Sequence, residues 1–129
     1  MQIVRVLVPV LAVLTLAGCS ATHGQPSSRA SLGLVSAPLA KEIGPDVPDE
    51  ARRKAAEAEF RALENGLAGV PVVWRQSDDA YGAVVPQQPY SVGSANCRRF
   101  TRNMTINGEP RSQTATACRR EDGIWRPLT

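Results

Sequence analysis

The chain has 129 residues, of which 15 are Lys or Arg and 12 are Asp or Glu, and its net charge is +3. This length allows one small domain with a modest core and excludes a multidomain architecture. The single histidine, His23, excludes a histidine-based metal site, because one imidazole cannot supply the several ligands that such a site needs.

The N-terminus has the parts of a secretory signal. Arg5 and the free amino group supply positive charge, and residues 6–16 form a nearly unbroken run of Val, Leu and Ala. A run of this length is too short to cross a bilayer as a helix, which needs about 20 residues. It ends in the sequence Leu16-Ala17-Gly18-Cys19.

This ending resembles the signal of bacterial lipoproteins. The resemblance implies that residues 1–18 are a cleaved signal peptide and that Cys19 carries membrane lipid. Ser20, as a residue other than Asp, is similar to the equivalent position of Gram-negative lipoproteins that reside in the outer membrane. The alternative is an ordinary cleaved signal followed by a chance cysteine.

Residues 19–47 predict a lipidated N-terminus followed by a disordered tether. The segment is rich in Ser, Ala, Gly, Pro and Thr and has no sustained apolar period. His23 lies within it and is expected to be solvated.

Residues 48–67 predict a helix. Asp49 and Glu50 place acid in its first turn, Ala, Glu and Arg fill its body, and Asn65-Gly66 predicts a left-handed cap. The apolar residues at helical spacing predict a narrow stripe that docks on the protein's own sheet, with a partner-binding helix as the alternative. The residues of this stripe are Ala56, Phe60, Leu63 and Leu67.

Residues 70–129 predict a small antiparallel β domain. The runs 70–75 and 81–85 consist of strand formers, and Pro86, Pro89 and Gly93 are expected to interrupt the next segment. Asn107-Gly108 is the strongest turn signal, because both central residues of a type I′ turn need a positive φ. The segments 97–106 and 109–120 should therefore pair as a hairpin.

The register of this hairpin predicts a disulfide. Around a two-residue turn at 107 and 108, opposed residues have numbers that sum to 215, as those of Cys97 and Cys118 do. Their pair is of the non-hydrogen-bonded type, with Cα atoms about 4.5 Å apart, within disulfide range. The same register sets Pro110 opposite Thr105, where its missing N–H costs nothing. A redox-active pair is the alternative, but the Cys-x-x-Cys spacing that lowers a thiol pKa is absent from this sequence.

Alternation along the hairpin assigns the two faces of the sheet. Phe100, Met104 and Ile106 share one side with Ala115 and Ala117, and the disulfide shares the other with a threonine row. On the apolar side, arginines are expected to restrict the core to the centre of the sheet. They are Arg98, Arg102 and Arg111.

Asp122-Gly123 predicts a turn that returns Trp125 along the second hairpin strand, with a longer turn or a bulge near 120–123. The predicted fold is mainly β with one helix (α+β). A small antiparallel meander is stapled by a cross-strand disulfide and preceded by a short helix and a disordered tether.

The order of residues from Trp74 to Trp125 resembles a known family. Trp74, Gly82, Tyr90 and the elements Cys97-Arg98, Asn107-Gly108, Ala117-Cys118-Arg119 and Asp122-Gly123 are similar to the C-terminal domain of the 17 kDa surface antigen family of bacterial outer-membrane lipoproteins. The resemblance covers about residues 74–126. It implies an envelope lipoprotein that is surface-exposed or faces the periplasm.

The predicted folded part offers little for catalysis. General acid and base chemistry uses a carboxylate pair or a histidine in a pocket, and the acidic pair Asp78-Asp79 has the surroundings of a solvated loop. The sequence also lacks a glycine-rich phosphate loop, a nucleophile elbow and a metal-spacing cluster. We therefore expect no enzyme activity, catalytic residue, metal or cofactor.

Positive charge is the remaining functional signal. From residue 70 on, eight arginines face five acidic residues, an excess that suits anionic envelope polymers or lipid headgroups. The candidate binding residues are Arg98, Arg119, Arg120 and Trp125.

Two hypotheses for function stay open. The first is an outer-membrane-anchored lipoprotein with a structural or interaction role, whose partners are membrane lipid at Cys19 and peptidoglycan, lipopolysaccharide or other envelope proteins. The second is a binding or inhibitor module that recognises an anionic envelope component or a soluble hydrolase through the arginines. An envelope hydrolase is a weaker third, and the compartment excludes nucleic acid.

Overall fold

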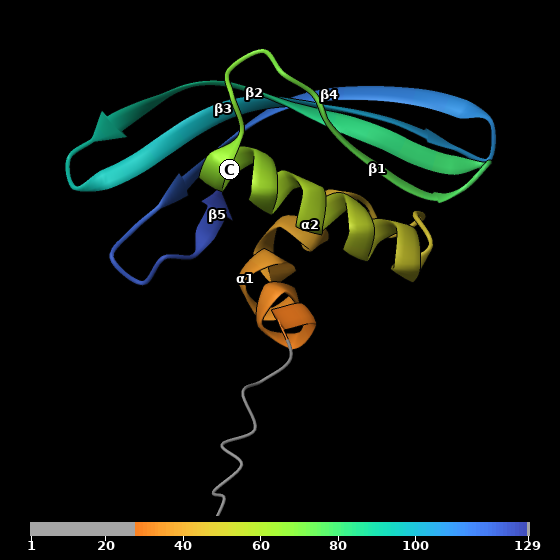
Figure 1. Ribbon diagram of the computed structural model, residues 1–129, viewed down its shortest axis with the longest axis horizontal. Coiled ribbons are helices and arrows are strands. Elements are labelled where there is room, and N and C mark those ends of the chain that lie inside the picture. The colour runs from red at the N-terminus through yellow and green to blue at the C-terminus, as the bar shows by residue number, and fades with distance from the viewer. Residues whose placement is uncertain (1–27, 129) are drawn as a thin grey trace, which may run out of the picture.

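The computed structural model describes residues 28–128, which form two helices followed by one sheet (Figure 1). The α+β class is confirmed, but there are two helices where the sequence predicted one. The helices are α1 (Ser28–Glu42) and α2 (Asp49–Asn65). The strands are β1 (Val72–Ser77), β2 (Ala80–Val92), β3 (Ala95–Ile106), β4 (Glu109–Arg119) and β5 (Trp125–Pro127).

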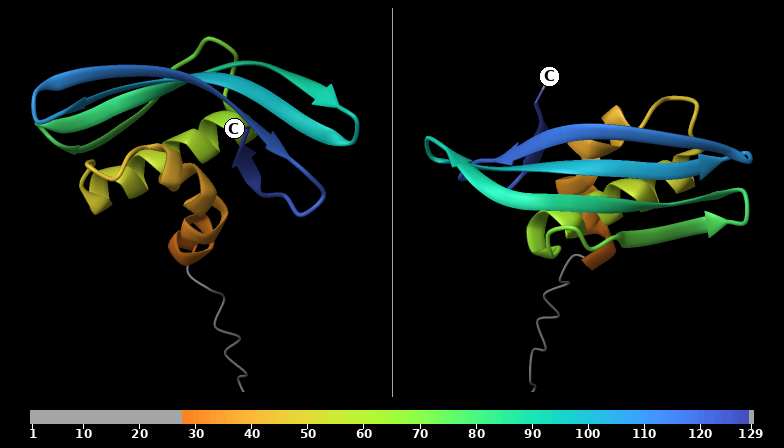
Figure 2. Two further views of the ribbon diagram at one scale, coloured as in Figure 1. Left: turned by 180° about the vertical axis from the view of Figure 1, so that it is seen from behind. Right: turned by 90° about the horizontal axis from the view of Figure 1, so that it is seen from above.

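The sheet is an antiparallel meander in which each strand pairs with the next, in the order β1-β2-β3-β4-β5. It curls around α2, which lies across its concave face (Figures 1 and 2). Helix α1 packs against α2 and against β5, on the side away from the long strands. We call the face against α2 the inner face and the opposite, convex face the outer face.

The β3–β4 hairpin has the predicted register. Asn107 and Gly108 form the turn with φ values of 53° and 78°, which is the positive-φ pair that the Asn-Gly sequence predicted. Thr105 lies opposite Pro110, and Cys97 lies opposite Cys118. The two cysteines form a disulfide with their Cα atoms 4.0 Å apart. The predicted disulfide and register are therefore confirmed.

Strand β2 and the β4–β5 connection are both longer than their turn residues alone suggest. Strand β2 runs on to Val92, and Pro86 and Pro89 mark a shift in its register with β3 instead of ending the strand. Prolines are tolerated at such an irregularity because the regular ladder of N–H donors is already broken there.

The β4–β5 connection spans 120–124, since Arg119 pairs with Trp125, which confirms the longer turn.

Helix α2 begins and ends close to its predicted bounds, but its end differs in conformation. Gly66 has φ −65° and ψ 141°, so the predicted left-handed cap is wrong. Glycine is needed there for space, because a Cβ would lie 2.5 Å from the carbonyl oxygen of Ala62 and 2.9 Å from Pro86.

The buried face of α2 is wider and richer in alanine than the predicted stripe. Ala56 and Leu63 are buried as expected and Phe60 is partly buried, but Leu67 lies beyond the helix and is 74 % exposed. Small side chains let the helix axis approach the sheet and α1 closely, which a search for large apolar residues does not detect. The other buried residues of this helix are Ala51, Ala55, Ala58, Glu59 and Ala62.

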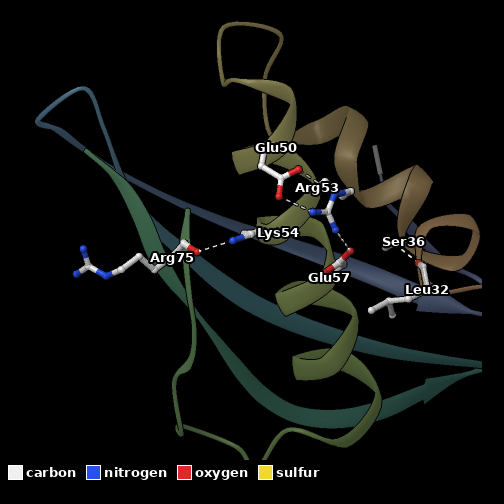
Figure 3. A network of polar contacts seen from close by, with 7 residues as sticks. All are labelled: Leu32, Ser36, Glu50, Arg53, Lys54, Glu57 and Arg75. Carbon is white, nitrogen blue, oxygen red and sulfur yellow. Dashed lines mark hydrogen bonds and ion pairs between the residues drawn. The ribbon is translucent and has the colours of Figure 1, made fainter. Parts of the chain in front are cut away.

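The opposite side of α2 carries ion pairs and protects a sheet edge (Figure 3). Arg53 donates to Glu50 at 2.5 Å and to Glu57 at 2.6 Å, the spacings that bring side chains together along a helix. Lys54 reaches across to the free edge of the sheet, where its Nζ donates to the carbonyl oxygen of Arg75 at 3.1 Å. A lysine over an edge strand hinders pairing with another chain.

Helix α1 corrects the predicted tether, because Ser28–Glu42 is helical in a segment expected to be disordered through residue 47. The segment lacks an obvious amphipathic period, yet Leu39, Ile43 and Val47 are each at most 6 % exposed. Packing of these few side chains against α2 and β5 stabilises a helix that local propensity does not predict. Residues 19–27 of the predicted tether lie outside the described residues.

The core is formed between α2 and the inner face of the sheet. Phe100, Met104, Ile106 and Ala117 are buried there as predicted, and Ala115 is partly buried. Trp74 joins them by lying against Gly82, where a Cβ would be 2.9 Å from the indole nitrogen. The expectation that arginines restrict this core is wrong, because Arg98 and Arg102 are themselves buried in it.

Candidate binding site

Arg98 is a structural residue of the core, although the sequence made it a candidate for binding. Its side chain points from β3 toward the end of α2 and is 5 % exposed. The guanidinium group donates to the carbonyl oxygens of Ala62 at 2.9 Å, Leu63 at 3.1 Å and Gly66 at 2.7 Å, and to that of Gln87 at 2.9 Å. It therefore neutralises the negative end of the helix dipole and satisfies carbonyls that the helix leaves unpaired.

Arg102 forms a buried ion pair with Glu59 of α2. The two side chains are 1 % and 0 % exposed, and the guanidinium makes two hydrogen bonds to the carboxylate, that from Nη2 being 3.0 Å long. Gln113 accepts a further hydrogen bond from Arg102 at 2.6 Å. Burial raises the pKa of Glu59, and Arg102 opposes that rise.

This buried pair was not predicted from the sequence. The sequence feature that could have indicated it is Glu59, a carboxylate on a helix face otherwise lined with alanine. A carboxylate on a buried face is unexpected unless a cation lies opposite.

Arg119 and Trp125, two of the candidate binding residues, lie together and share an internal partner. Glu64 of α2 accepts hydrogen bonds from Arg119 and, at 2.8 Å, from the indole Nε1 of Trp125. The Arg119 guanidinium also lies 5.5 Å from the centroid of the Trp125 ring. Trp125 is only 3 % exposed, so most of this cluster holds β4 and β5 to the helix.

Arg99 and Arg120 differ from these residues. Both are exposed, and neither makes an ion pair or a side-chain hydrogen bond with another residue of the described range 28–128. Arg120 lines a hollow of about 570 Å³ beside the disulfide, together with Arg126 and Asp122. The candidate arginines therefore do not form one patch, and the free charge lies on the outer face and at this hollow.

A second groove lies on the outer face toward the other end of the sheet. It has a volume of about 510 Å³ and is lined by Val73, Tyr81 and Pro110 among others. Arg75 lies over the Tyr81 ring, 4.7 Å from its centroid, and pairs with Asp78 at 3.2 Å. Arg111, the cation that lines the groove, pairs with Asp46 at 2.7 Å, so both cations at this end of the sheet are already partnered.

The acidic residues of the described range do not gather into a metal site. Asp78 and Asp79 are exposed in the β1–β2 turn, as predicted for a solvated loop. Residues 28–128 contain no group of three His, Cys, Asp or Glu side chains suited to hold a metal ion. Among the same residues, no helix has both the length and the apolar character to cross a membrane. The signal peptide, Cys19 and His23 lie outside the described part of the chain.

The β domain of this chain is similar to known proteins. Residues 61–126, from the last turns of α2 to β5, match the model of the family described as 17 kDa outer membrane surface antigen. The chain belongs to this family. The match contains the disulfide, the Asn-Gly hairpin and the inner-face arginines, and the predicted resemblance is confirmed.

Relatives in this family are similar over the same part of the chain. The 17 kDa surface antigen of Rickettsia bellii is 34 % identical over 87 residues, which cover 66 % of this chain and 55 % of the relative. Those of Rickettsia conorii and Rickettsia rickettsii are 37 % identical over 81 residues, or 60 % of this chain and 51 % of each relative. The chain thus spans about half the length of the curated relatives it matches. No solved structure matches it.

Proposed function

We propose that this protein is an outer-membrane lipoprotein, anchored through lipid on Cys19, whose β domain has a structural or interaction role in the cell envelope. The observation that carries the proposal is family membership, since the family is described by its place at the outer membrane surface. The sequence Leu16-Ala17-Gly18-Cys19 behind an apolar run supports the anchor. The disulfide supports it too, because Cys97 and Cys118 are paired and Cys19 remains as the odd cysteine.

The chemistry of the described residues favours interaction over catalysis. The buried charged groups hold the helix to the sheet, and the exposed guanidinium groups of Arg99 and Arg120 suit anionic surfaces. A small disulfide-bonded sheet is also a rigid body that can be held at a membrane surface while it contacts other envelope components.

The anchor is tested by labelling cells with radioactive palmitate. We expect the wild-type protein and the Cys97→Ala/Cys118→Ala variant to be labelled and to fractionate with membranes. The Cys19→Ser variant should lose the label. Label that persists in Cys19→Ser, or its absence from the wild type, would overturn the lipid anchor.

The role is tested by crosslinking the protein in living cells and identifying the molecules that are recovered with it. The proposal predicts recovery with peptidoglycan, lipopolysaccharide or membrane proteins of the envelope. Recovery of a single soluble hydrolase would favour the inhibitor module instead. The Arg99→Gln/Arg120→Gln variant serves as a comparison, since it removes the free arginines and no internal contact.

A further inference from the structure

The hollow beside the disulfide combines an apolar rim with a disulfide wall. Cys97 and Cys118 line it, and Val92 and Leu128 lie at its rim with 58 % and 60 % of their surface exposed. Large aliphatic side chains with this exposure around one hollow are unfavourable in water unless something covers them. Tyr90, which pairs with Cys97 and is 46 % exposed, extends the same surface.

Unpaired positive charge surrounds this apolar rim. Arg120 lines the hollow, and Arg99 lies on the same face of β3 as Cys97, two residues further along the strand. Neither makes an ion pair or a side-chain hydrogen bond with another described residue, although the charge of Arg120 helps to lower the pKa of Asp122. The third cation, Arg126, is paired with Asp122 at 2.8 Å. The surroundings of the hollow therefore keep an excess of two guanidinium groups.

Guanidinium groups match phosphate oxygens with two parallel hydrogen bonds, and apolar side chains beside them match acyl chains. A soluble anion would use the arginines but not Val92 and Leu128. A polysaccharide would likewise leave the aliphatic rim in water. A lipid headgroup at a membrane surface offers partners for both parts of the surface at once.

We infer that the hollow lined by Arg120, Val92 and Leu128, with Arg99 beside it on β3, docks on the membrane by binding the phosphate of an anionic phospholipid headgroup. The inference rests on the proposed function, because the anchor at Cys19 would hold the folded domain near lipid. Nine peptide links join Cys19 to Ser28, which limits the separation to about 30 Å even for a fully extended chain. Such a short tether keeps the local headgroup concentration high and favours a second, weak contact.

The mature lipidated protein tests this contact in lipid nanodiscs. One set of discs contains phosphatidylcholine alone and the other contains phosphatidylglycerol as well, each with a trace of lipid that is spin-labelled on its headgroup. The measured quantity is the paramagnetic broadening of the methyl signals of Val92 and Leu128. We expect much stronger broadening in the anionic discs, with a decrease as salt concentration rises.

Two charge variants separate this hollow from net charge. Arg99→Gln/Arg120→Gln should lower the docking constant about 25-fold, because each arginine near an anionic surface contributes a factor of about five. Arg61→Gln/Arg75→Gln removes the same charge from exposed positions away from the hollow. This variant should change the docking constant less than about twofold. Val92→Ser/Leu128→Ser should weaken docking, but docking should still decrease with salt concentration because the arginines are unchanged.

Several results would overturn the inference. The first two are equal broadening of the methyl signals in both kinds of disc and an equal loss of docking in the two charge variants. The third is a response of the same methyl signals to inorganic phosphate that is as strong as their response to anionic discs. The fourth is binding of the protein to purified peptidoglycan in preference to the discs. Palmitate labelling of the same preparation reports the anchor separately. If the protein carries no lipid on Cys19, the broadening of its methyl signals by added discs still reports the docking contact. Failure of the anchor and failure of the docking are therefore distinguishable.

Discussion

Two pairs of adjacent arginines show how this small sheet uses one residue type for two purposes. Arg98 and Arg99 are neighbours on β3, and Arg119 and Arg120 are neighbours at the end of β4. The first member of each pair points to α2 and binds its carbonyl or carboxylate oxygens, whereas the second is exposed without an internal partner among the described residues. For Arg98 and Arg99, strand alternation produces this division, since successive side chains point to opposite faces. Arg120 lies just beyond the last residue of β4, in the connection to β5.

The difference shows that a count of arginines says little about binding. On the inner face, Arg98 and Arg102 are stabilised by oxygens that α2 supplies, so their charge is used within the fold. No described helix covers the outer face, where the disulfide and the hollow lie. The charges of Arg99 and Arg120 are therefore exposed to solvent and available to a partner. Variants on the two faces should therefore differ in stability, with the larger losses on the inner face.

The largest effect is expected at the inner-face ion pair. Glu59→Gln should destabilise the fold by about 3–5 kcal/mol, because it leaves the buried charge of Arg102 without a counterion, and a guanidinium cannot lose its proton. Arg102→Met should cost less at low pH, because the orphaned carboxyl can take up a proton. Urea unfolding measures both variants.

The pH dependence of Arg102→Met has a definite sign. Burial already raises the pKa of Glu59 above 4.5, and loss of Arg102 removes the main influence that lowers it. A raised folded-state pKa gives stability that is present below the unfolded pKa and lost as pH rises through the folded value. The stability gap to the wild type should therefore widen as pH rises from the folded-state pKa of Glu59 in the wild type toward its higher pKa in Arg102→Met, and Glu59→Gln should lack this trend. Parallel pH profiles for the two variants would contradict the ion pair.

The disulfide gives the second prediction, on the side of the sheet that no described helix covers. Cys97→Ala/Cys118→Ala should lose about 3 kcal/mol, as expected for a bridge between residues 21 positions apart. Hydrogen exchange should increase most near Val92, Ala95 and β5, while β3 near Phe100 keeps its protection. Uniform loss of protection would show that the bridge stabilises the whole sheet and not this end.

The Glu64 cluster gives the third prediction. Glu64→Ala should cost about 1–2 kcal/mol, because it leaves the indole N–H of the buried Trp125 without an acceptor and breaks the pair with Arg119. Glu64→Gln is the matched control, since its amide oxygen can still accept from Trp125. Thermal unfolding should rank the wild type above Glu64→Gln and Glu64→Gln above Glu64→Ala; equal losses would assign the effect to the ion pair alone.

The smallest effect is expected at an exposed pair. A hydrogen bond from Arg111 at 2.7 Å lowers the pKa of Asp46 below 3.8. A lowered pKa gives stability that is present above 3.8 and lost as pH falls through the folded value. In a carboxyl NMR titration, Arg111→Gln should return the pKa of Asp46 toward 3.8, whereas Arg126→Gln should move Asp122 only. An unchanged Asp46 in Arg111→Gln would mean that this pair is absent in solution.

Local and short-range signals made part of this structure predictable. The Asn107-Gly108 turn fixed the register, and the register brought Cys97 and Cys118 together, because these features depend only on backbone conformation and counting. Helix α1 was not predictable in this way, since Leu39 and Val47 stabilise it through contacts with distant elements. The same holds for Arg98 and Arg102, whose partners on α2 are 35 to 43 positions away.

The free energies of unfolding of Arg98→Gln and Arg99→Gln, measured side by side in urea, test the central contrast most directly. The two variants change neighbouring residues of one strand in the same way. Arg98→Gln should lose about 3 kcal/mol, because buried carbonyls at the end of α2 lose their donor, while Arg99→Gln should stay within about 0.5 kcal/mol of the wild type. Equal losses in the two variants would contradict the division between structural and free arginines.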